Sequence, residues 1–189
     1  MLGYEDFEEK TITRKKIFKG KIIDVYLDDV SLPKGGTGKR ELVFHNGGVG
    51  LLAITSENKI VLVKQFRKPL EKVVLEIPAG KIENGEGHSP AETGVRELEE
   101  ETGYRAQRLE HLTSMYLSPG FSNEMLHVYH AIDLEKVEHP LPQDEDEVLE
   151  IFELTLTEAK EKMATQEICD AKTIFAIQYW ELLLEKERD

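Results

Sequence analysis

One stretch of the sequence, from Pro78 to Tyr104, joins a glycine-rich loop to a short helix with clear start and stop signals. Ser89 can cap the helix, Pro90 suits its first position, and Glu92 completes a capping box. Gly103 suits a left-handed cap at the other end. Local chemistry therefore predicts both ends of this helix before any tertiary contact is considered.

The predicted helix separates acidic from apolar side chains. At about 100° per residue, Glu97, Glu100 and Glu101 lie at i, i+3 and i+4 and share one face. Glu99 points away from that face. The face expected to pack on the core carries Ala91, Val95, Leu98 and Thr102.

The acidic face opposes helix formation. Like charges at i, i+4 cost about 0.2–0.5 kcal/mol per pair, and Glu100 and Glu101 also lie near the negative end of the helix dipole. A divalent cation would turn this repulsion into ligation, because Mg²⁺ and Mn²⁺ prefer carboxylate oxygens. A bare E-x-x-E-E run is more often a solvated face, but the preceding glycine loop favours a metal site.

The stretch resembles the Nudix box, G-x5-E-x7-R-E-U-x-E-E-x-G-U, in which U is apolar. Its fixed positions are occupied here by Gly80, Glu86, Arg96, Glu97, Leu98, Glu100, Glu101, Gly103 and Tyr104. One departure is visible, because nine residues separate Glu86 from Arg96 where the pattern has seven. The extra residues precede the helix cap and should lengthen the loop without rotating the helix.

The resemblance implies a metal-dependent hydrolase. Glu97 would be a catalytic residue, and Arg96 would orient the glutamates. The implied ligands of more than one Mg²⁺ or Mn²⁺ ion are Glu97, Glu100, Glu101, Glu86 and the carbonyl of Ala79.

Alternating and apolar runs predict the rest of the fold. Strands are expected at 21–32, 39–45, 49–54, 60–66, 73–77, 112–117, 125–132 and 148–154. Helices are expected at 157–164, capped by Thr157, and after Asp170, whereas residues 1–10 should be loose. This order predicts a mixed α/β sandwich. The resemblance implies the Nudix α/β/α sandwich with a mixed sheet, plus a small N-terminal β unit.

We expect two domains, residues 1–46 as the N-terminal β unit and residues 47–189 as the hydrolase domain. The β unit is too small to bury a core alone. It should therefore pack on the main domain or on a partner chain. The resemblance implies that it serves dimerisation and substrate contact, in a homodimer in which this unit reaches the other subunit. Tyr26 and Phe18 on this unit are candidates for stacking on an adenine.

Composition excludes several classes of protein. The net charge of −13 argues against nucleic-acid binding through a basic surface. The N-terminus lacks the features of a signal peptide, and no apolar run approaches membrane length, so we expect a cytoplasmic protein without a membrane partner. Cys169 is the only cysteine, and the six histidines lack zinc-ligand spacing.

Pro119, fifteen positions after Tyr104, resembles the mark of the ADP-ribose pyrophosphatase subgroup, although Pro119-Gly120 could equally be an ordinary turn. The resemblance implies substrate contacts from Pro119, Gly120, Arg67 and Arg40. Arginine suits this role because its planar fork grips phosphate oxygens. For either arginine taken singly, solvation at the surface is the more common explanation.

A second acidic segment, Pro142–Glu150, precedes a predicted strand. Such a run is usually a solvated loop, but the subgroup places an acidic catalytic loop here. We expect the base that activates water to be Glu147, then Glu145, with Glu124 third.

The predicted reaction is hydrolysis of ADP-ribose to AMP and ribose 5-phosphate. The resemblance covers nearly the whole chain, including D-A-K-T-I-F-A-I-Q-Y-W near its end. Two alternatives stay open. The substrate could be another nucleoside diphosphate derivative (a sugar nucleotide, NADH or a dinucleoside polyphosphate), or the chain could be a non-catalytic ligand sensor.

Overall fold

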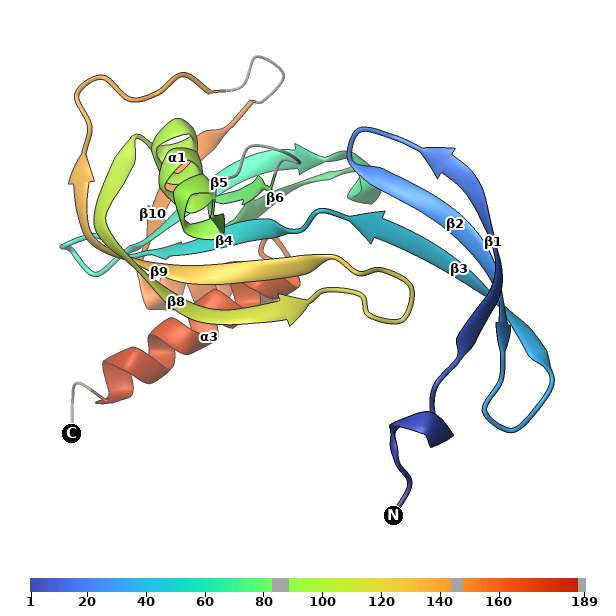
Figure 1. Ribbon diagram of the computed structural model, residues 1–189. Coiled ribbons are helices and arrows are strands. Elements are labelled where there is room, and N and C mark those ends of the chain that lie inside the picture. Colours follow the sequence, from blue (N-terminus) through green and yellow to red (C-terminus); the bar gives the residue numbers. More distant parts are fainter. Residues whose placement is uncertain (83–88, 144–147, 187–189) are drawn as a thin grey trace. The chain divides into compact units, whose positions relative to one another are not determined.

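The computed structural model describes residues 1–82, 89–143 and 148–186. It divides into two compact units (Figure 1). One consists of Met1–Gly47 with Tyr116–Met125, and the other of Gly48–Met115 with Leu126–Asp189. The segment Tyr116–Met125, which carries Pro119 and Gly120, therefore groups with the N-terminal strands, although the sequence placed it after residue 46 in the hydrolase domain.

The first unit holds a three-stranded antiparallel sheet with the order β1-β2-β3, after a short 3-10 helix at Tyr4–Asp6. Its strands are β1 (Lys10–Lys19), β2 (Ile23–Ser31) and β3 (Thr37–His45). Strand β1 was not predicted from the sequence, because its lysines hide the alternation of apolar and polar residues. It forms a strand because it pairs with β2. All ten residues of β1 are exposed, and the three strands bury only Asp28 and Val30.

In its described residues, the second unit contains two sheets and three α-helices. Its strands are β4 (Gly48–Ala53), β5 (Ile60–Arg67), β6 (Lys72–Glu76), β7 (Ala79–Lys81), β8 (Tyr104–Tyr116), β9 (Met125–Lys136) and β10 (Glu150–Leu154). One sheet has the antiparallel order β10-β5-β6. The other has the order β7-β4-β9-β8, with β4 parallel to β9 and antiparallel to β7. The predicted mixed sheet is confirmed.

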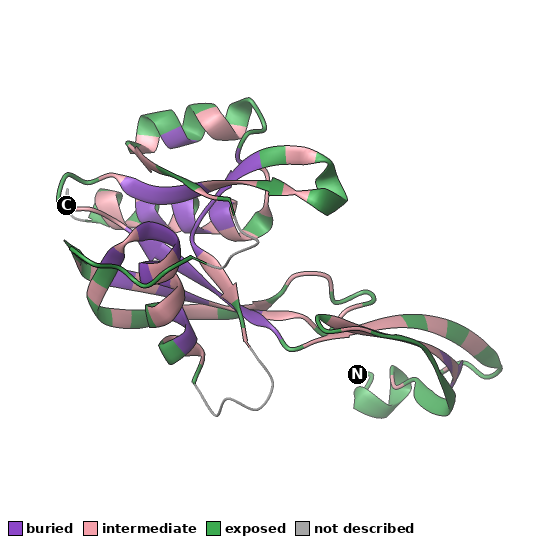
Figure 2. Ribbon diagram, turned by 90° about the horizontal axis from the view of Figure 1, so that it is seen from above, coloured by how far each residue is buried: buried purple, intermediate pink, exposed green. Residues whose placement is uncertain are grey.

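The helices cover both faces of the central strands. Side chains alternate along β4, so that Leu51 faces a cluster with Leu98 of α1 (Pro90–Thr102). Leu52 faces the opposite cluster, with Trp180 of α3 (Ala171–Lys186) and a residue of α2 (Leu156–Ala164). A strand buried on both faces reads as a continuous apolar run. Figure 2 shows this burial concentrated in the central strands, which gives the α/β/α arrangement that was predicted.

Several predicted boundaries were wrong. Strand β8 begins at Tyr104, not near residue 112. Arg105, Gln107, Arg108 and Glu110 make most of its first half polar, which weakens the alternation, although Tyr104 is buried. Helix α2 is capped by Thr155, whose side chain accepts a hydrogen bond from the amide of Glu158, and not by Thr157. The predicted cap of α3 is confirmed, since Asp170 Oδ1 accepts from the amide of Thr173 at 3.1 Å. No helix in the described part of the chain is long and apolar enough to cross a membrane.

Helix α1 ends where its caps predict. The Ser89 hydroxyl accepts from the amide of Glu92, the Glu92 carboxylate accepts from the amide of Ser89, and Gly103 has a φ of 66°. Leu98 and Thr102 are buried as expected, but Val95 is 41% exposed. The reason is that Gly94 faces the sheet, where a Cβ would lie 3.2 Å from Leu51. The side chain of Val95, which follows Gly94, is therefore turned away from the sheet.

Replacing Ser89 with alanine should lower the free energy of unfolding by about 1 kcal/mol, the usual value of an N-cap side chain. For a chain of this length the midpoint should fall by about 2–4 °C per kcal/mol. Thermal melting followed by circular dichroism measures the change. Ser89→Thr, which keeps the capping oxygen, should melt close to the parent, and an alanine variant that does the same would contradict the cap assignment.

Candidate active site

Helix α1 lies directly against the glycine-loop strand β7. The short strand pairs with β4, and Gly80 lies opposite Val49. A Cβ placed on Gly80 would lie only 2.1 Å from Cγ and Cδ of Glu97. Only glycine lets the helix and its Glu97 side chain come this close to the loop backbone. The glycine of the motif therefore has a steric role that its place in the pattern alone does not show.

A second glutamate of α1 holds the same loop. The amide of Ala79 donates to Glu101 Oε2 at 3.0 Å. Glu101 is 3% exposed, so this hydrogen bond is sheltered from water. Because its amide binds the helix, Ala79 is held beside α1, where its carbonyl was expected to serve as a ligand.

Arg96 links the other two carboxylates of the acidic face. Its Nη2 donates to Glu97 Oε1 at 2.7 Å, and its Nη1 donates to Glu100. Burial by itself would lower the pKa of Arg96, but the charges of Glu97 and Glu100 and their hydrogen bonds raise it. The positive charge of Arg96 lies between these carboxylates and offsets part of their mutual repulsion. The contacts support an orienting role for Arg96.

The donor atoms on this face are chemically suited to a hard divalent cation. Glu97, Glu100 and Glu101 offer carboxylate oxygens on adjacent turns beside Ala79, the ligand type that Mg²⁺ and Mn²⁺ prefer. Over the described ranges, no group of three or more His, Cys, Asp or Glu residues converges closely enough to hold an ion. Glu97 and Glu100 each accept a hydrogen bond from Arg96 through one carboxylate oxygen.

Arg67 of β5 is held by a buried glutamate that the sequence reasoning missed. Its Nε and Nη2 donate to the two carboxylate oxygens of Glu76 at 2.9 and 2.7 Å. Lys172 of α3 donates to the same carboxylate. The hydrogen bonds that Arg67 donates to Glu76 raise the pKa of Arg67 against the effect of burial, and the charge of Glu101 adds to the rise. Arg67 therefore lies within electrostatic range of the acidic helix.

Glu76 is 2% exposed. Burial would raise its pKa, but hydrogen bonds from Arg67 and the charges of Lys172 and Arg67 together lower it. A signal for this residue was present, since Glu76 is the one charged residue in the run V-V-L-E-I-P-A-G that ends at Gly80. A charge in such a run is expected to be paired.

Arg40 and Glu124 lie in the first unit. Arg40 Nε donates to Glu9 Oε2 at 2.7 Å. Glu124 Oε1 is 3.8 Å from Nδ1 of His45. Arg40 therefore has an ionic partner within its own unit, whereas Glu124 lies only near His45, whose Nδ1 accepts from the amide of Gly47.

Pro119 and Gly120 form a turn in which the amides of Phe121 and Ser122 donate to the carbonyl of Ser118, at 3.2 and 2.9 Å. A Cβ at Gly120 would meet no atom within 4 Å, so nothing at this turn requires glycine sterically.

The two aromatic candidates differ in their surroundings. Tyr26 packs edge-on against Phe44, and the Arg14 guanidinium lies over both rings. Phe18 is 53% exposed. Of the remaining predicted residues, Glu86, Glu145 and Glu147 lie outside the described residues.

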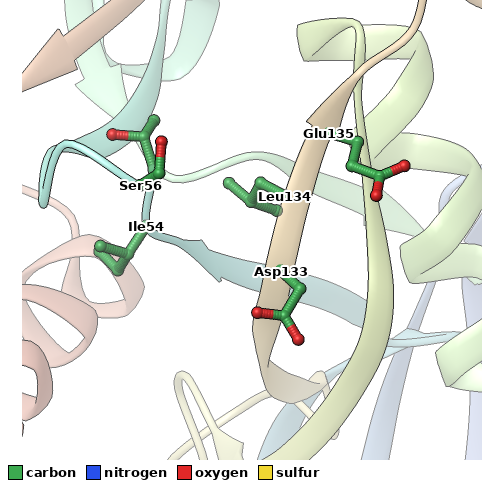
Figure 3. Close-up of a pocket in the computed structure, with 6 residues that line it drawn as sticks. Ile54, Ser56, Asp133, Leu134 and Glu135 are labelled. Carbon is green, nitrogen blue, oxygen red and sulfur yellow. The ribbon is translucent and has the colours of Figure 1, made fainter.

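A shallow pocket lies at another place in the second unit (Figure 3). It is lined by Ile54, Thr55, Ser56, Asp133, Leu134 and Glu135. Leu134 points from β9 toward the segment that carries Ile54 and Ser56, and Glu135 points away. None of the predicted site residues that the structure describes lines it, so it does not mark the site formed by α1 and the glycine loop.

Replacing Gly80 with alanine should lower kcat by about tenfold or more while the fold survives. The new Cβ would displace the Glu97 side chain, which can rotate, so the structural cost is small, whereas catalytic groups tolerate little displacement. Steady-state kinetics and thermal melting measure the two effects. Gly120→Ala, which meets open space, is the control for a loop glycine. Full activity in Gly80→Ala would show that the close approach is unimportant.

Comparison with known proteins agrees with these observations. The NUDIX domain family matches residues 44–174. The chain is 52% identical over 178 residues to the ADP-ribose pyrophosphatase of Bacillus subtilis (strain 168), covering 94% of this chain and 95% of that protein. It is also 52% identical over 176 residues to the methanol dehydrogenase activator of Bacillus methanolicus, covering 93% and 94%.

A solved structure supports the fold. The crystal structure of an ADP compounds hydrolase matches with a TM-score of 0.83 and 20% identity, covering 95% of this chain and 96% of that one. The family match, the two full-length relatives and the mixed sheet with α1 against its glycine loop agree, and the chain belongs to the Nudix hydrolase family.

Proposed function

We propose that this enzyme hydrolyses the pyrophosphate of ADP-ribose to AMP and ribose 5-phosphate. The observation that carries the proposal is the contact of α1 with the glycine loop, where Glu97 lies against Gly80 and Glu101 holds Ala79. The relative from Bacillus subtilis, named an ADP-ribose pyrophosphatase, supports the choice of substrate.

The Nudix family requires a divalent metal, and we assign Mg²⁺ or Mn²⁺, with more than one ion per site, to Glu97, Glu100, Glu101, Glu86 and the Ala79 carbonyl. Bound there, the metal would neutralise the phosphate oxygens and acidify the attacking water. Arg96 orients the carboxylates of Glu97 and Glu100 for metal binding through its hydrogen bonds to both.

Arginines would bind the substrate's phosphate oxygens. Glu76 takes the Nε and Nη2 edge of Arg67, so Nη1 is the part of the fork that can reach a phosphate. Arg40, on the first unit, would contribute from the neighbouring subunit. A carboxylate from Glu147, Glu145 or Glu124 would take the proton of the attacking water.

Another nucleoside diphosphate derivative is the second candidate substrate. The relative named methanol dehydrogenase activator has the same 52% identity as the ADP-ribose pyrophosphatase, so identity alone does not select the substrate. A non-catalytic sensor ranks last, because all the helix carboxylates of the motif are present.

Hydrolysis in ¹⁸O-water tests the proposal. With ADP-ribose and Mg²⁺, mass analysis should show AMP and ribose 5-phosphate, one of them carrying the label, which identifies the attacked phosphorus. A parallel comparison of kcat/KM over ADP-ribose, sugar nucleotides, NADH and dinucleoside polyphosphates ranks the substrates. A substrate that ranks far above ADP-ribose would replace it in the proposal.

We propose a homodimer formed through the first unit. Every residue of β1 is exposed, and Ile12, Ile17 and Phe18 are each more than half exposed. A strand with exposed apolar side chains and a free edge is typical of an interface. The N-terminal sheet would pack on the other subunit and bring Arg40 to its site.

Light scattering at micromolar concentration should give the mass of a dimer. The double variant Ile12→Asp/Ile17→Asp should shift the protein toward the monomer, because the interface would bury two unpaired charges. It should also raise KM for ADP-ribose, because Arg40 of the other subunit would no longer reach the site. Leu182→Asp, an exposed leucine of α3, is the matched control and should remain dimeric. A fully active parent monomer would contradict the proposal.

A further inference from the structure

The N-terminal end of α3 is joined to the strand that leads into the glycine loop. Lys172 of α3 donates to Glu76 of β6 and to Asp170 Oδ1, the latter at 3.0 Å. The amide of Ile77 donates to the Thr173 hydroxyl at 2.9 Å in a buried hydrogen bond. The segment just before Pro78 is therefore held by α3 through one charged and one neutral contact.

These contacts form one charge-balanced network with Arg67. It has two cations, Arg67 and Lys172, and two anions, Glu76 and Asp170. Lys172 and Glu76 are sheltered, with side-chain exposures of 12% and 3%. Asp170 Oδ2 is buried and has no hydrogen-bond partner among the described residues. Lys172, Glu76 and Asp170 are therefore coupled strongly, because water screens sheltered charges little, whereas Arg67, at 38% exposed, reaches the surface.

We propose that Lys172 is a positioning residue for the substrate arginine, Arg67. The inference rests on the proposed function, in which Arg67 binds the pyrophosphate. Lys172 donates a hydrogen bond to the Glu76 carboxylate and neutralises part of its negative charge. Glu76 can therefore hold the Arg67 guanidinium in place while Arg67 keeps positive charge for the substrate. This gives a function to the D-A-K-T run, which the sequence analysis left without a role.

The physical reason is the balance of charge. Without Lys172, both Glu76 and Asp170 would act on Arg67 alone. Its positive charge would then be neutralised by buried anions and would attract the anionic substrate less. Glu76, no longer bonded to α3 through Lys172, would also hold the Arg67 guanidinium in a less fixed position. The effect should therefore appear in substrate affinity more than in the chemical step.

The test compares Lys172→Met and Lys172→Arg with Lys160→Met. Lys160 pairs with Glu181 on the protein surface, so its variant removes the same charge without touching the network. Lys172→Met should raise KM for ADP-ribose about tenfold, the scale of one charge-assisted hydrogen bond from Arg67 to the substrate, with kcat within a few-fold. Lys172→Arg should restore most of the affinity, and Lys160→Met should match the parent.

A double-mutant cycle shows whether Lys172 acts through Arg67. In an Arg67→Ala background, Lys172→Met should change KM by less than twofold, because the positioned group is gone. An equal effect with and without Arg67 would overturn the inference, as would a Lys172→Met variant with the kinetics of Lys160→Met.

Lys172→Gln, which is polar and similar in length, provides a second variant should Lys172→Met unfold. It should show the same rise in KM, and exchange of the Arg67 Nε proton with water, followed by NMR, should be faster than in the parent. Unchanged exchange and KM in Lys172→Gln would overturn the inference. A parent that leaves ADP-ribose intact would instead overturn the proposed function.

Discussion

Replacing Glu97 and Glu101 together with glutamine should abolish hydrolysis of ADP-ribose while the protein stays folded. Both residues lie where α1 meets the glycine loop, and a neutral amide is a poor ligand for Mg²⁺ or Mn²⁺ compared with a carboxylate. Glutamine keeps an oxygen that can accept from the Ala79 amide, so the loop contact survives.

Stability of the double variant should change little. The pair Arg96–Glu97 is partly exposed, so its loss should cost about 1 kcal/mol or less. Relief of like-charge repulsion, at about 0.2–0.5 kcal/mol per pair, offsets part of this. Melting in the presence of a chelator measures the metal-free protein, and a large drop in its midpoint would show that these glutamates are structural.

Glu99→Gln is the matched control, since it makes the same chemical change on the same helix. Glu99 is 5% exposed and accepts from Arg105 Nε and Nη2 at 3.0 and 2.8 Å. This variant should lose stability and keep kcat within a few-fold. The opposite responses of the two faces of α1 would separate catalytic from structural carboxylates.

The second large effect is expected from the acidic residue that activates water. Gln substitutions at Glu147, Glu145 and Glu124, made singly, should lower kcat by roughly 10²–10⁴-fold at one position, with little change in KM, as is usual for loss of a general base. We expect that position to be Glu147, because it directly precedes Val148 and the strand that follows.

Assays at saturating Mg²⁺ with ADP-ribose decide between the three residues. Glu150→Gln, which changes an exposed carboxylate paired with Lys64, controls for charge removal in the same region and should retain the parent kcat. If all three candidates keep kcat within a few-fold of the parent, the motif itself must supply the base.

The sequence alone determined the features that depend on neighbours along the chain. Ser89 and Gly103 cap α1 as predicted, because capping is a contact between residues a few positions apart. The apolar runs of β4 and β5 identified the buried strands. These patterns, with the resemblance of the motif, were enough for the α/β/α fold and the Nudix family.

Only the tertiary structure decided which face of α1 is buried. Periodicity placed Val95 toward the core, but the close approach of Gly94 to Leu51 rotates the helix and leaves Val95 exposed. A helical wheel gives relative directions around an axis, not the position of the sheet. Strand β1 was missed for a related reason, since its partner β2 and not its own composition makes it a strand.

The network around Arg67 also required the tertiary structure. Glu76 and Lys172 are 96 positions apart, and no local pattern relates a strand residue to a helix so far along the chain. Packing of α3 against the central strands brings them together. The sequence thus determined the acidic helix, because its caps are contacts between residues a few positions apart, whereas the tertiary structure decided how the helix meets its glycine loop and what holds Arg67.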